Sequence, residues 1–285
     1  MGTQLSQPNN DLKNSLFTVI LCAGEGVRFK EITYKTPKPL IKINVLDKKP
    51  ILHYTIDLLI KLSVNRIAIV KGYLGNKIDE FIDIIERENT DLKEILFMVD
   101  AKDQYKLGPL YSFLSITKNK QLFQSKYIYL IMPGDTIFQY QLLNEIFSFI
   151  KENFDVIQKS PLTFFRKIER NFLKQKNQSK QVSLAYVEKD NSQNFLKRIK
   201  QVSLSKISDS ESINQIIPIF LFPYNFIQEI LDIEKKISVK TIREVINYSI
   251  KQGKGIFAIE IDSDYNFYDI DNKLDLIELE KLREK

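Results

Sequence analysis

The sequence predicts a doubly wound α/β fold around a mostly parallel sheet, and three observations support it. Short apolar runs alternate with amphipathic stretches of helical periodicity through the first half of the chain. The apolar runs are nearly continuous, which is typical of parallel strands covered by helices on both faces. At 285 residues, with 44% hydrophobic and 27% charged residues, the chain is long enough and apolar enough for a sizeable core.

The first half contains strands and helices in alternation. Pro50 suits the first turn of a helix over 50–63, and Asn76 is the predicted N-cap of a helix over 76–89. A further helix is predicted over 108–119. The strands are predicted at 16–21, 66–70, 95–99 and 127–132. Because the carboxyl ends of parallel strands meet at one edge of a sheet, the loops that follow these strands should form a ligand site.

The second half changes to shorter β segments and two helices, near 225–235 and 239–252. The β segments are predicted at 155–160, 181–187, 194–199, 216–222 and 256–261. No linker rich in Pro, Gly or Ser separates the two halves. We therefore predict a disordered arm over 1–14 and a single domain over 15–285, in which a mixed β region packs on the same sheet.

Charge and composition limit the classes of partner. The net charge of +6 and a pI near 9.0 indicate an anionic partner, which could be a phosphorylated metabolite, nucleic acid or anionic lipid. The basic stretch 164–181 is predicted to be a solvated, mobile insertion rather than a nucleic-acid patch. Gly2 and Ser6 match a myristoylation pattern, which we interpret as chance.

Cysteine usage and hydropathy indicate the compartment. Cys22 is the single cysteine, which excludes an internal disulfide and fits a reducing environment. No apolar run reaches the roughly 18 to 20 residues that a membrane helix needs, and the first residues lack the features of a signal peptide. We therefore expect a cytoplasmic protein with no membrane span.

The segment CAGEGVRFKEITYKTPKPL (22–40) carries the clearest sign of function. It follows the first predicted strand, and its first two glycines let backbone N–H groups approach a phosphate closely. Arg28 would clamp a phosphate oxygen, and Lys38, stiffened by a proline on each side, would hold a second cation near the same anion. The pattern is neither a Walker A loop nor the dinucleotide motif G-x-G-x-x-G. It therefore predicts a phosphate site of another kind.

Two acidic segments follow later in the chain. Asp135 comes just after the strand over 127–132, where a carboxylate can hold Mg²⁺ against bound phosphates. By itself, G-D-T at a strand end is more often a turn or a helix N-cap. The segment YDIDNKLDL (268–276) contains three further aspartates, which by themselves would be caps for a final helix.

Together these motifs resemble the nucleotidyltransferase family of nucleotide-diphospho-sugar synthesis. The family opens with approximately L-A/G-A/G-G-x-G-T/S-R and then P-K-P-L, and residues 21–29 and 37–40 follow that pattern. The resemblance continues through 49–82. It implies a Rossmann-like, nucleotide-diphospho-sugar transferase fold with a nucleotide-binding half over 15–154 and an acceptor-binding half over 155–285.

The resemblance also implies the site, residue by residue. Arg28 and Lys38 are the expected catalytic cations. Mg²⁺ is the expected cofactor, held by Asp135 and Asp269 with Asp271 as the alternate ligand, while Asp275 is expected to be structural. The expected nucleotide contacts are Leu21, Cys22, Ala23, Gly24, Glu25, Gly26, Gly108 and Asp135.

Three departures from the family pattern leave the substrates open. Pro109 and Leu110 stand where the family has Thr-Ala, and Val27 stands where it has a hydroxyl residue. The family's E-K-P sugar motif has no clear match, with only Lys197 and Lys200 near its expected place.

The activity that the resemblance implies is Mg²⁺-dependent transfer of NMP from an NTP to a sugar-1-phosphate, giving NDP-sugar and pyrophosphate. The expected partners are an NTP and a phosphorylated small-molecule acceptor rather than nucleic acid, and a homo-oligomer is compatible with the sequence. Two alternatives stay open. One is a cytidylyltransferase acting on phosphocholine or inositol phosphate, and the other is a non-catalytic regulatory homologue.

Overall fold

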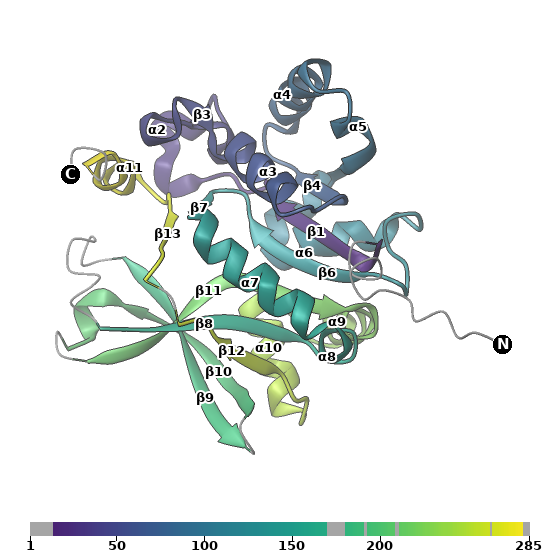
Figure 1. Ribbon diagram of the computed structural model, residues 1–285, viewed down its shortest axis with the longest axis vertical. Helices are drawn as coiled ribbons and strands as arrows, with labels where there is room; N and C mark the ends of the chain where they lie inside the picture. Colours follow the sequence, from purple (N-terminus) through teal and green to yellow (C-terminus); the bar gives the residue numbers. More distant parts are fainter. Residues whose placement is uncertain (1–13, 170–179, 191–192, 209–210, 263, 282–285) are drawn as a thin grey trace.

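A nine-stranded sheet forms the centre of the computed structural model (Figure 1), which describes residues 14–169, 180–190, 193–208, 211–262 and 264–281. Almost all of the predicted arm over 1–14 lies outside the described residues. Across the sheet the strands follow the order β5 (Leu96–Asp100), β4 (Ile67–Lys71), β1 (Leu16–Leu21), β6 (Ile128–Pro133), β11 (Ser212–Pro223), β8 (Leu162–Glu169), β12 (Phe257–Glu260), β10 (Gln193–Ser203) and β9 (Gln181–Asp190).

The sheet is parallel in its first part and mixed in its second. Strands β5, β4, β1 and β6 are parallel, whereas β11 is antiparallel to both β6 and β8. Strand β12 is parallel to β8, and β10 is antiparallel to β12 and β9. Parallel neighbours need a long crossover, but Asp190 of β9 pairs directly with Gln193 of β10 in a hairpin. The predicted parallel pairing therefore holds for the first half only, and the second half is the mixed β region that was predicted on the same sheet.

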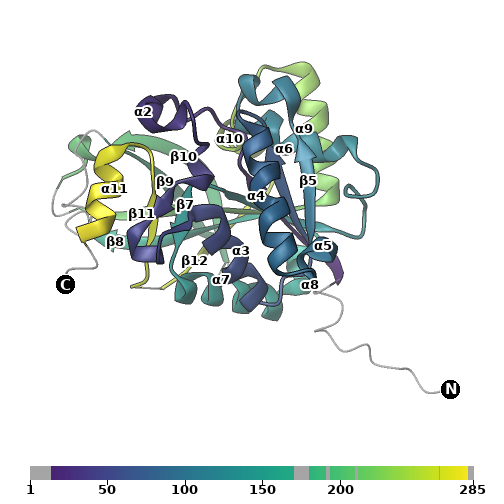
Figure 2. The same ribbon diagram turned by 90° about the horizontal axis from the view of Figure 1, so that it is seen from above.

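Helices cover both faces of the sheet (Figure 2). Successive side chains of β1 point to opposite faces of the sheet, so both faces need cover. Leu16 and Ile20 join one buried cluster, and Phe17 and Val19 join another. The first cluster takes side chains from α3 (Ile51–Lys61), α4 (Gly75–Glu88) and α7 (Tyr140–Glu152). The second takes side chains from α6 (Pro109–Leu114), α9 (Tyr224–Lys236) and α10 (Ile242–Lys251).

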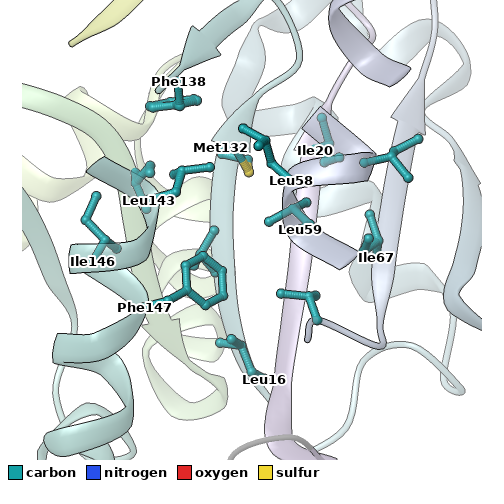
Figure 3. Close-up of a cluster of buried hydrophobic side chains, with 14 of the residues drawn as sticks. Leu16, Ile20, Leu58, Leu59, Ile67, Met132, Phe138, Leu143, Ile146 and Phe147 are labelled. Atoms are coloured by element: carbon teal, nitrogen blue, oxygen red, sulfur yellow. The ribbon is translucent and has the colours of Figure 1, made fainter. Parts of the chain in front are cut away.

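Figure 3 shows how the first cluster is packed. Leu58 and Leu59 of α3 and Phe147 of α7 lie over Leu16 of β1 and Met132 of β6. These side chains interdigitate above the parallel strands, so the two helices hold the strand ends in place. Within the described residues, none of the helices combines the length and apolar character needed to span a membrane.

Two predicted elements differ in the structure. Helix α4 begins at Gly75, and its N-cap is Leu74 in the left-handed conformation rather than Asn76. The backbone makes this turn itself, since the Gly75 N–H donates to the Gly72 carbonyl at 3.0 Å. The segment predicted as a strand over 155–160 contains the short helix α8 (Phe154–Ile157), whose two apolar end residues are buried at helical spacing.

The basic stretch 164–181 is also corrected. Its first residues belong to β8, which has a strand on each side, and Phe164, Phe165 and Arg166 are buried. At its other end Lys180 is mostly buried. Residues 170–179 lie outside the described residues, so the predicted solvated insertion is wrong at both ends of the stretch.

A small layer beside the sheet joins the opening segment to the C-terminal part. Strand β7 (Thr136–Phe138) pairs with β13 (Phe267–Asp269), and α11 (Lys273–Glu280) follows. A third buried cluster takes residues from both regions, including Phe29, Ile41 and Leu279. Figure 1 shows β13 and α11 beside α2 (Lys30–Thr33) and β3 (Lys49–Pro50). Segments from opposite ends of the chain are thus held side by side. Elsewhere, β2 (Lys42–Ile43) pairs with β3, and α5 (Leu92–Ile95) precedes β5.

Candidate functional site

The loop after β1 is shaped around the side chain of Lys38. Gly26 has a φ of 62°, and its carbonyl accepts hydrogen bonds from the Phe29 N–H at 2.8 Å and the Thr33 hydroxyl at 3.1 Å. A Cβ at position 26 would lie 2.8 Å from Thr33 Cγ2 and 3.1 Å from Lys38 Cγ. Glycine is therefore required there by the backbone conformation and by the close passage of Lys38.

Lys38 lies between two carboxylates from distant parts of the chain. Its Nζ is 3.2 Å from Asp135 Oδ2 and 3.2 Å from Asp271 Oδ1. Arg28 Nη1 lies 3.2 Å from Asp271 Oδ2, with the guanidinium largely exposed. The structure thus brings together both predicted cations and two of the three predicted metal ligands.

Strand pairing brings in the third aspartate. Asp269 pairs with Thr136 across β7 and β13, and the Thr136 hydroxyl donates to Asp269 Oδ1 at 2.6 Å. The next residue, Ile270, donates its N–H to the Asp135 carbonyl at 3.2 Å. The three aspartates consequently gather where β6 ends; we call Asp135, Asp269 and Asp271 the aspartate cluster.

Lys180 and Asp275 hold the segment that carries Asp269 and Asp271. Lys180 Nζ donates to the Asp269 carbonyl and to Asp275 Oδ1, each at 2.8 Å. Asp275 Oδ2 accepts from the N–H groups of Asp271 at 2.8 Å and Asn272 at 3.1 Å. Only 8% of the Lys180 side chain and 3% of the Asp275 side chain are exposed. The predicted structural role of Asp275 is confirmed, since it also completes a capping box for α11.

The charges of the cluster shift two pKa values. Burial raises the pKa of the Asp135 carboxyl; Lys38 opposes this, and the charges of Asp269 and Asp271 raise the pKa further, so that it stays above its ordinary value. Asp135 lies deep in the protein but faces a cavity, which is why 34% of its side chain is exposed. Burial lowers the pKa of Lys38, but the charges of Asp135 and Asp271 outweigh burial and raise it.

A cluster of three carboxylates offers the oxygen ligands that suit a hard divalent cation such as Mg²⁺. Asp135, Asp269 and Asp271 are the side chains that could hold it. Among the described residues, no group of three His, Cys, Asp or Glu side chains is arranged to bind a metal by itself. An ion here would therefore need further oxygen ligands, which phosphates and water commonly supply to Mg²⁺.

The raised pKa of Asp135 predicts a pH-dependent effect of Asp135→Asn on stability. The pKa of the Asp135 carboxyl is near 3.8 in the unfolded chain and higher in the folded protein. At pH values between these two, the folded wild type binds more protons than the unfolded chain. The free energy of unfolding of the wild type therefore falls as pH rises through this range. That of the Asn variant does not fall in this way, because an amide does not titrate. Urea unfolding at about pH 3.5 and about pH 7 should show the variant gaining stability relative to the wild type at the higher pH. An equal difference at both pH values would contradict the assignment.

Two adjoining cavities meet at the aspartate cluster. The loop-side cavity, about 440 Å³, is lined by the opening loop together with Tyr105, Pro109 and Ser112. The sheet-side cavity, about 310 Å³, is lined by strands β9, β10 and β11 and the first turn of α10. Asp135 and Asp271 line both cavities, so this cluster lies between two spaces that could each hold one substrate.

Most predicted site residues line the loop-side cavity, and three do not. Asp269 lines only the sheet-side cavity, whereas Glu25 and Gly108 line neither. The predicted residues that line the loop-side cavity are Leu21, Cys22, Ala23, Gly24, Gly26, Arg28, Lys38, Asp135 and Asp271. Gly108 instead has the Lys240 carbonyl packed against it, so close that a Cβ would lie 2.4 Å from that oxygen.

Cys22 is buried at the end of β1. A Cβ at Gly134 would lie 2.5 Å from its Sγ, so these two loops can approach only because position 134 is glycine. Burial, followed by the charge of Asp135, raises the pKa of the Cys22 thiol. The thiol therefore stays neutral and fills space between the strand ends.

Several cavity residues were missed by sequence reasoning. Lys180 contacts groups 89 and 95 positions away, so no local pattern marks it. The wall of the sheet-side cavity includes Gln201, Gln215 and Arg243, which carry no motif. The alternation of Ile199 and Gln201 on one face of β10 is the only sequence signal for any of them. Lys197 and Lys200 line neither cavity, and Lys197 forms an exposed ion pair with Glu188.

Curated relatives match only part of this chain. The choline-phosphate cytidylyltransferase of Streptococcus pneumoniae is 39% identical over 61 residues, which are 21% of this chain and 25% of that protein. The "Probable glucose-1-phosphate cytidylyltransferase" of Bacillus subtilis is 40% identical over 73 residues, 25% of this chain and 28% of that protein. The matched segment thus spans about a quarter of the length of these relatives.

Solved structures share the fold along nearly the whole chain. The CTP:phosphocholine cytidylyltransferase of Streptococcus pneumoniae has a TM-score of 0.60 at 17% identity, covering 94% of this chain and 99% of that one. A UDP-glucose pyrophosphorylase complexed with UDP-glucose has a TM-score of 0.66 at 14% identity, covering 95% and 98%. The inositol-1-phosphate CTP transferase of T. maritima has a TM-score of 0.61 at 18% identity, covering 94% and 96%.

A family-wide sequence pattern described as "Nucleotidyl transferase" matches residues 17–170, which is more than half of the chain. The matched residues include the opening loop, Arg28, Lys38 and Asp135. With an α/β fold that agrees with solved nucleotidyltransferases over more than nine-tenths of its length, this chain belongs to the nucleotidyl transferase family.

Proposed function

We propose that this protein transfers NMP from an NTP to a sugar-1-phosphate, giving NDP-sugar and pyrophosphate. The observation that carries the proposal is the position of Lys38, whose ammonium bridges Asp135 and Asp271 at the meeting point of two cavities. One cavity would hold the nucleotide and the other the acceptor, so the transferred phosphorus would lie beside this cation.

The reaction follows from this arrangement. An oxygen of the acceptor phosphate attacks the α-phosphorus in line; a new O–P bond forms, and the bond to the β-phosphate oxygen breaks with its electron pair leaving on pyrophosphate. No side-chain base is needed, because a phosphate monoester is largely ionised at neutral pH. Catalysis therefore depends on positioning and on stabilisation of negative charge.

Each cation has a distinct place in this scheme. Lys38, mostly buried and locked by the aspartates, would stabilise charge at the α-phosphoryl group. Arg28, on the exposed side of the loop-side cavity, would neutralise the triphosphate and the departing pyrophosphate. Asp135, Asp269 and Asp271 would hold Mg²⁺, which supplies charge neutralisation between the nucleotide and acceptor phosphates when bound.

A second candidate is a cytidylyltransferase that acts on phosphocholine or inositol phosphate. It is favoured by the matches to a choline-phosphate cytidylyltransferase and an inositol-1-phosphate CTP transferase. A non-catalytic homologue is less well supported. Such a protein would be free to lose Arg28, Lys38 and the aspartate cluster, all of which this chain keeps.

Pyrophosphate release tests the proposal directly. The protein with Mg²⁺ would be assayed with each of ATP, CTP, GTP, UTP and dTTP against glucose-1-phosphate, mannose-1-phosphate, N-acetylglucosamine-1-phosphate, inositol-1-phosphate and phosphocholine. Release that needs one nucleotide and one sugar-1-phosphate supports the proposal. Release with CTP and phosphocholine or inositol phosphate alone supports the second candidate. Folded protein that binds no NTP and releases no pyrophosphate supports the non-catalytic homologue.

Arg28→Ala is expected to lower kcat/KM about 10²-fold, because a charge-stabilising donor is lost from the phosphate site. Its melting temperature should change little, since the Arg28–Asp271 pair is exposed and such pairs contribute about 0 to 1 kcal/mol. Arg87→Ala, an exposed arginine on α4 outside both cavities, is the matched control and should keep full activity. Equal activity in the two variants would remove Arg28 from the site.

A further inference from the structure

The wall of the sheet-side cavity is lined by groups that donate hydrogen bonds. Gln215 on β11, Gln201 on β10 and Arg243 in the first turn of α10 all line it. An amide side chain can normally offer either its oxygen or its N–H groups to a ligand. In this cavity, arginines bind the amide oxygens of these two glutamines and so leave the amide N–H groups for a ligand.

Arg166 takes the oxygen of Gln215. Its Nε and Nη2 donate to Gln215 Oε1 at 3.0 and 2.9 Å. Burial lowers the pKa of Arg166 to about 10, so it is still a cation at neutral pH. A guanidinium has donors and no acceptor, so the amide oxygen must face it. The N–H groups are then what Gln215 can offer to the cavity.

Arg243 takes the oxygen of Gln201 in the same way. Its Nη1 donates to Gln201 Oε1 at 2.6 Å. Among the described residues Arg243 has no carboxylate at ion-pair distance, and its partner Gln201 is neutral. A cation in the first turn of a helix is also disfavoured by the helix dipole. An anionic ligand in the cavity would give Arg243 a negative partner and would interact favourably with the N-terminus of α10.

The aromatic residues of the cavity are poorly placed to bind a quaternary ammonium. Among the residues that the structure describes, Phe220 and Phe267 are the aromatic side chains that line it. The Phe267 ring already has the Arg166 guanidinium over it, with Cζ 5.0 Å from the ring centre. Recognition of choline-like groups commonly uses a cage of several free aromatic faces. Besides the aspartate cluster, this cavity presents cationic and amide donors.

We propose that Arg243 selects the acceptor by binding an anionic group of it in the sheet-side cavity, with the N–H groups of Gln201 and Gln215 donating to the same molecule. The anionic group is either the phosphate that attacks or a second phosphate or carboxylate on the acceptor. The inference rests on the proposed transfer reaction. It assigns Arg243 to acceptor binding.

Arg243→Gln removes the charge and keeps a side chain of similar reach. We expect the acceptor KM to rise about tenfold or more while the NTP KM changes less than about twofold. Arg243→Lys should recover part of the loss by restoring the charge. Arg198→Gln, an exposed arginine on β10 that lines neither cavity, is the matched control. Circular dichroism and melting temperature would verify that each variant is folded.

The acceptors tell the two sources of the anion apart. An equal rise in KM for glucose-1-phosphate, glucuronic acid-1-phosphate and glucose-1,6-bisphosphate assigns Arg243 to the attacking phosphate. A rise confined to the last two assigns it to the second anionic group. A KM that is unchanged in Arg243→Gln for all three acceptors overturns the proposal.

A binding measurement separates this inference from the proposed reaction. Without nucleotide, glucose-1,6-bisphosphate, which carries both kinds of anionic group, should raise the melting temperature of the wild type and of Arg198→Gln, and not that of Arg243→Gln. If this difference appears but no NTP and acceptor pair releases pyrophosphate, the reaction fails and the anion site stands. If turnover occurs and Arg243→Gln behaves as the wild type in both measurements, the inference alone fails.

Discussion

Asp135→Asn is expected to lower kcat/KM for pyrophosphate release about 10³-fold or more while the protein stays folded. The change removes one of the carboxylates proposed to hold Mg²⁺ at the point where both cavities meet, and metal-assisted charge stabilisation is worth several kcal/mol. The fold should tolerate it, because Lys38 keeps its ion pair with Asp271 at 3.2 Å. Steady-state kinetics with the active substrate pair, together with thermal melting, would measure both effects.

Asp262→Asn is the matched control for this substitution. Asp262 is an exposed aspartate that precedes β13 and lines neither cavity. It should keep activity within about twofold of the wild type, as expected for a surface change. Near-normal turnover by Asp135→Asn would contradict the site, whereas loss of turnover together with loss of folding would show that Asp135 is structural.

Lys180→Met is expected to lower the free energy of unfolding by about 3 kcal/mol, since it leaves the Asp275 carboxylate buried without its cation. Activity should fall as well, because Lys180 also holds the Asp269 carbonyl and so the segment that carries Asp269 and Asp271. The Mg²⁺ concentration that gives half-maximal activity should rise. Urea unfolding and a Mg²⁺ titration would measure the two effects.

A double-mutant cycle tests the pairing itself. Lys180→Met combined with Asp275→Asn removes both charges, so the double variant should be more stable than the sum of the two single losses predicts. Lys77→Met, which breaks the exposed pair with Glu80 on α4, is the control and should cost less than about 1 kcal/mol. Additive losses for Lys180 and Asp275 would show that the buried pair is not coupled.

The first half of the fold and the loop after β1 were predictable because their signals are local. Continuous apolar runs identify β1, β4, β5 and β6, whose pairing is parallel as expected. The spacing of Arg28 and Lys38 around a glycine turn and two prolines is contained in one short segment, and the structure places both beside the aspartates. Asp135 follows β6 directly, so its position depends only on the end of that strand.

Several features could not be predicted from local sequence signals, because they depend on contacts between distant segments. Asp269 reaches Asp135 only through the pairing of β7 with β13, which joins residues 133 positions apart at the Thr136–Asp269 hydrogen bond. The stretch 164–181 has the composition of an exposed loop, yet its first residues form an interior strand. Burial of Arg166 there is tolerated because Gln215, Tyr265 and Asn266 accept its hydrogen bonds.

The sequence by itself determined the α/β fold class, the glycine turn after β1 and the charged residues of that loop, because each is encoded in the order of neighbouring residues. Tertiary structure alone decided the order of the strands in the mixed half of the sheet, that Lys180 and Asp275 hold the aspartate cluster, and that Arg243 faces a second cavity. Those outcomes depend on which buried polar groups meet across the chain. Such groups are stable only when a partner from another segment satisfies them.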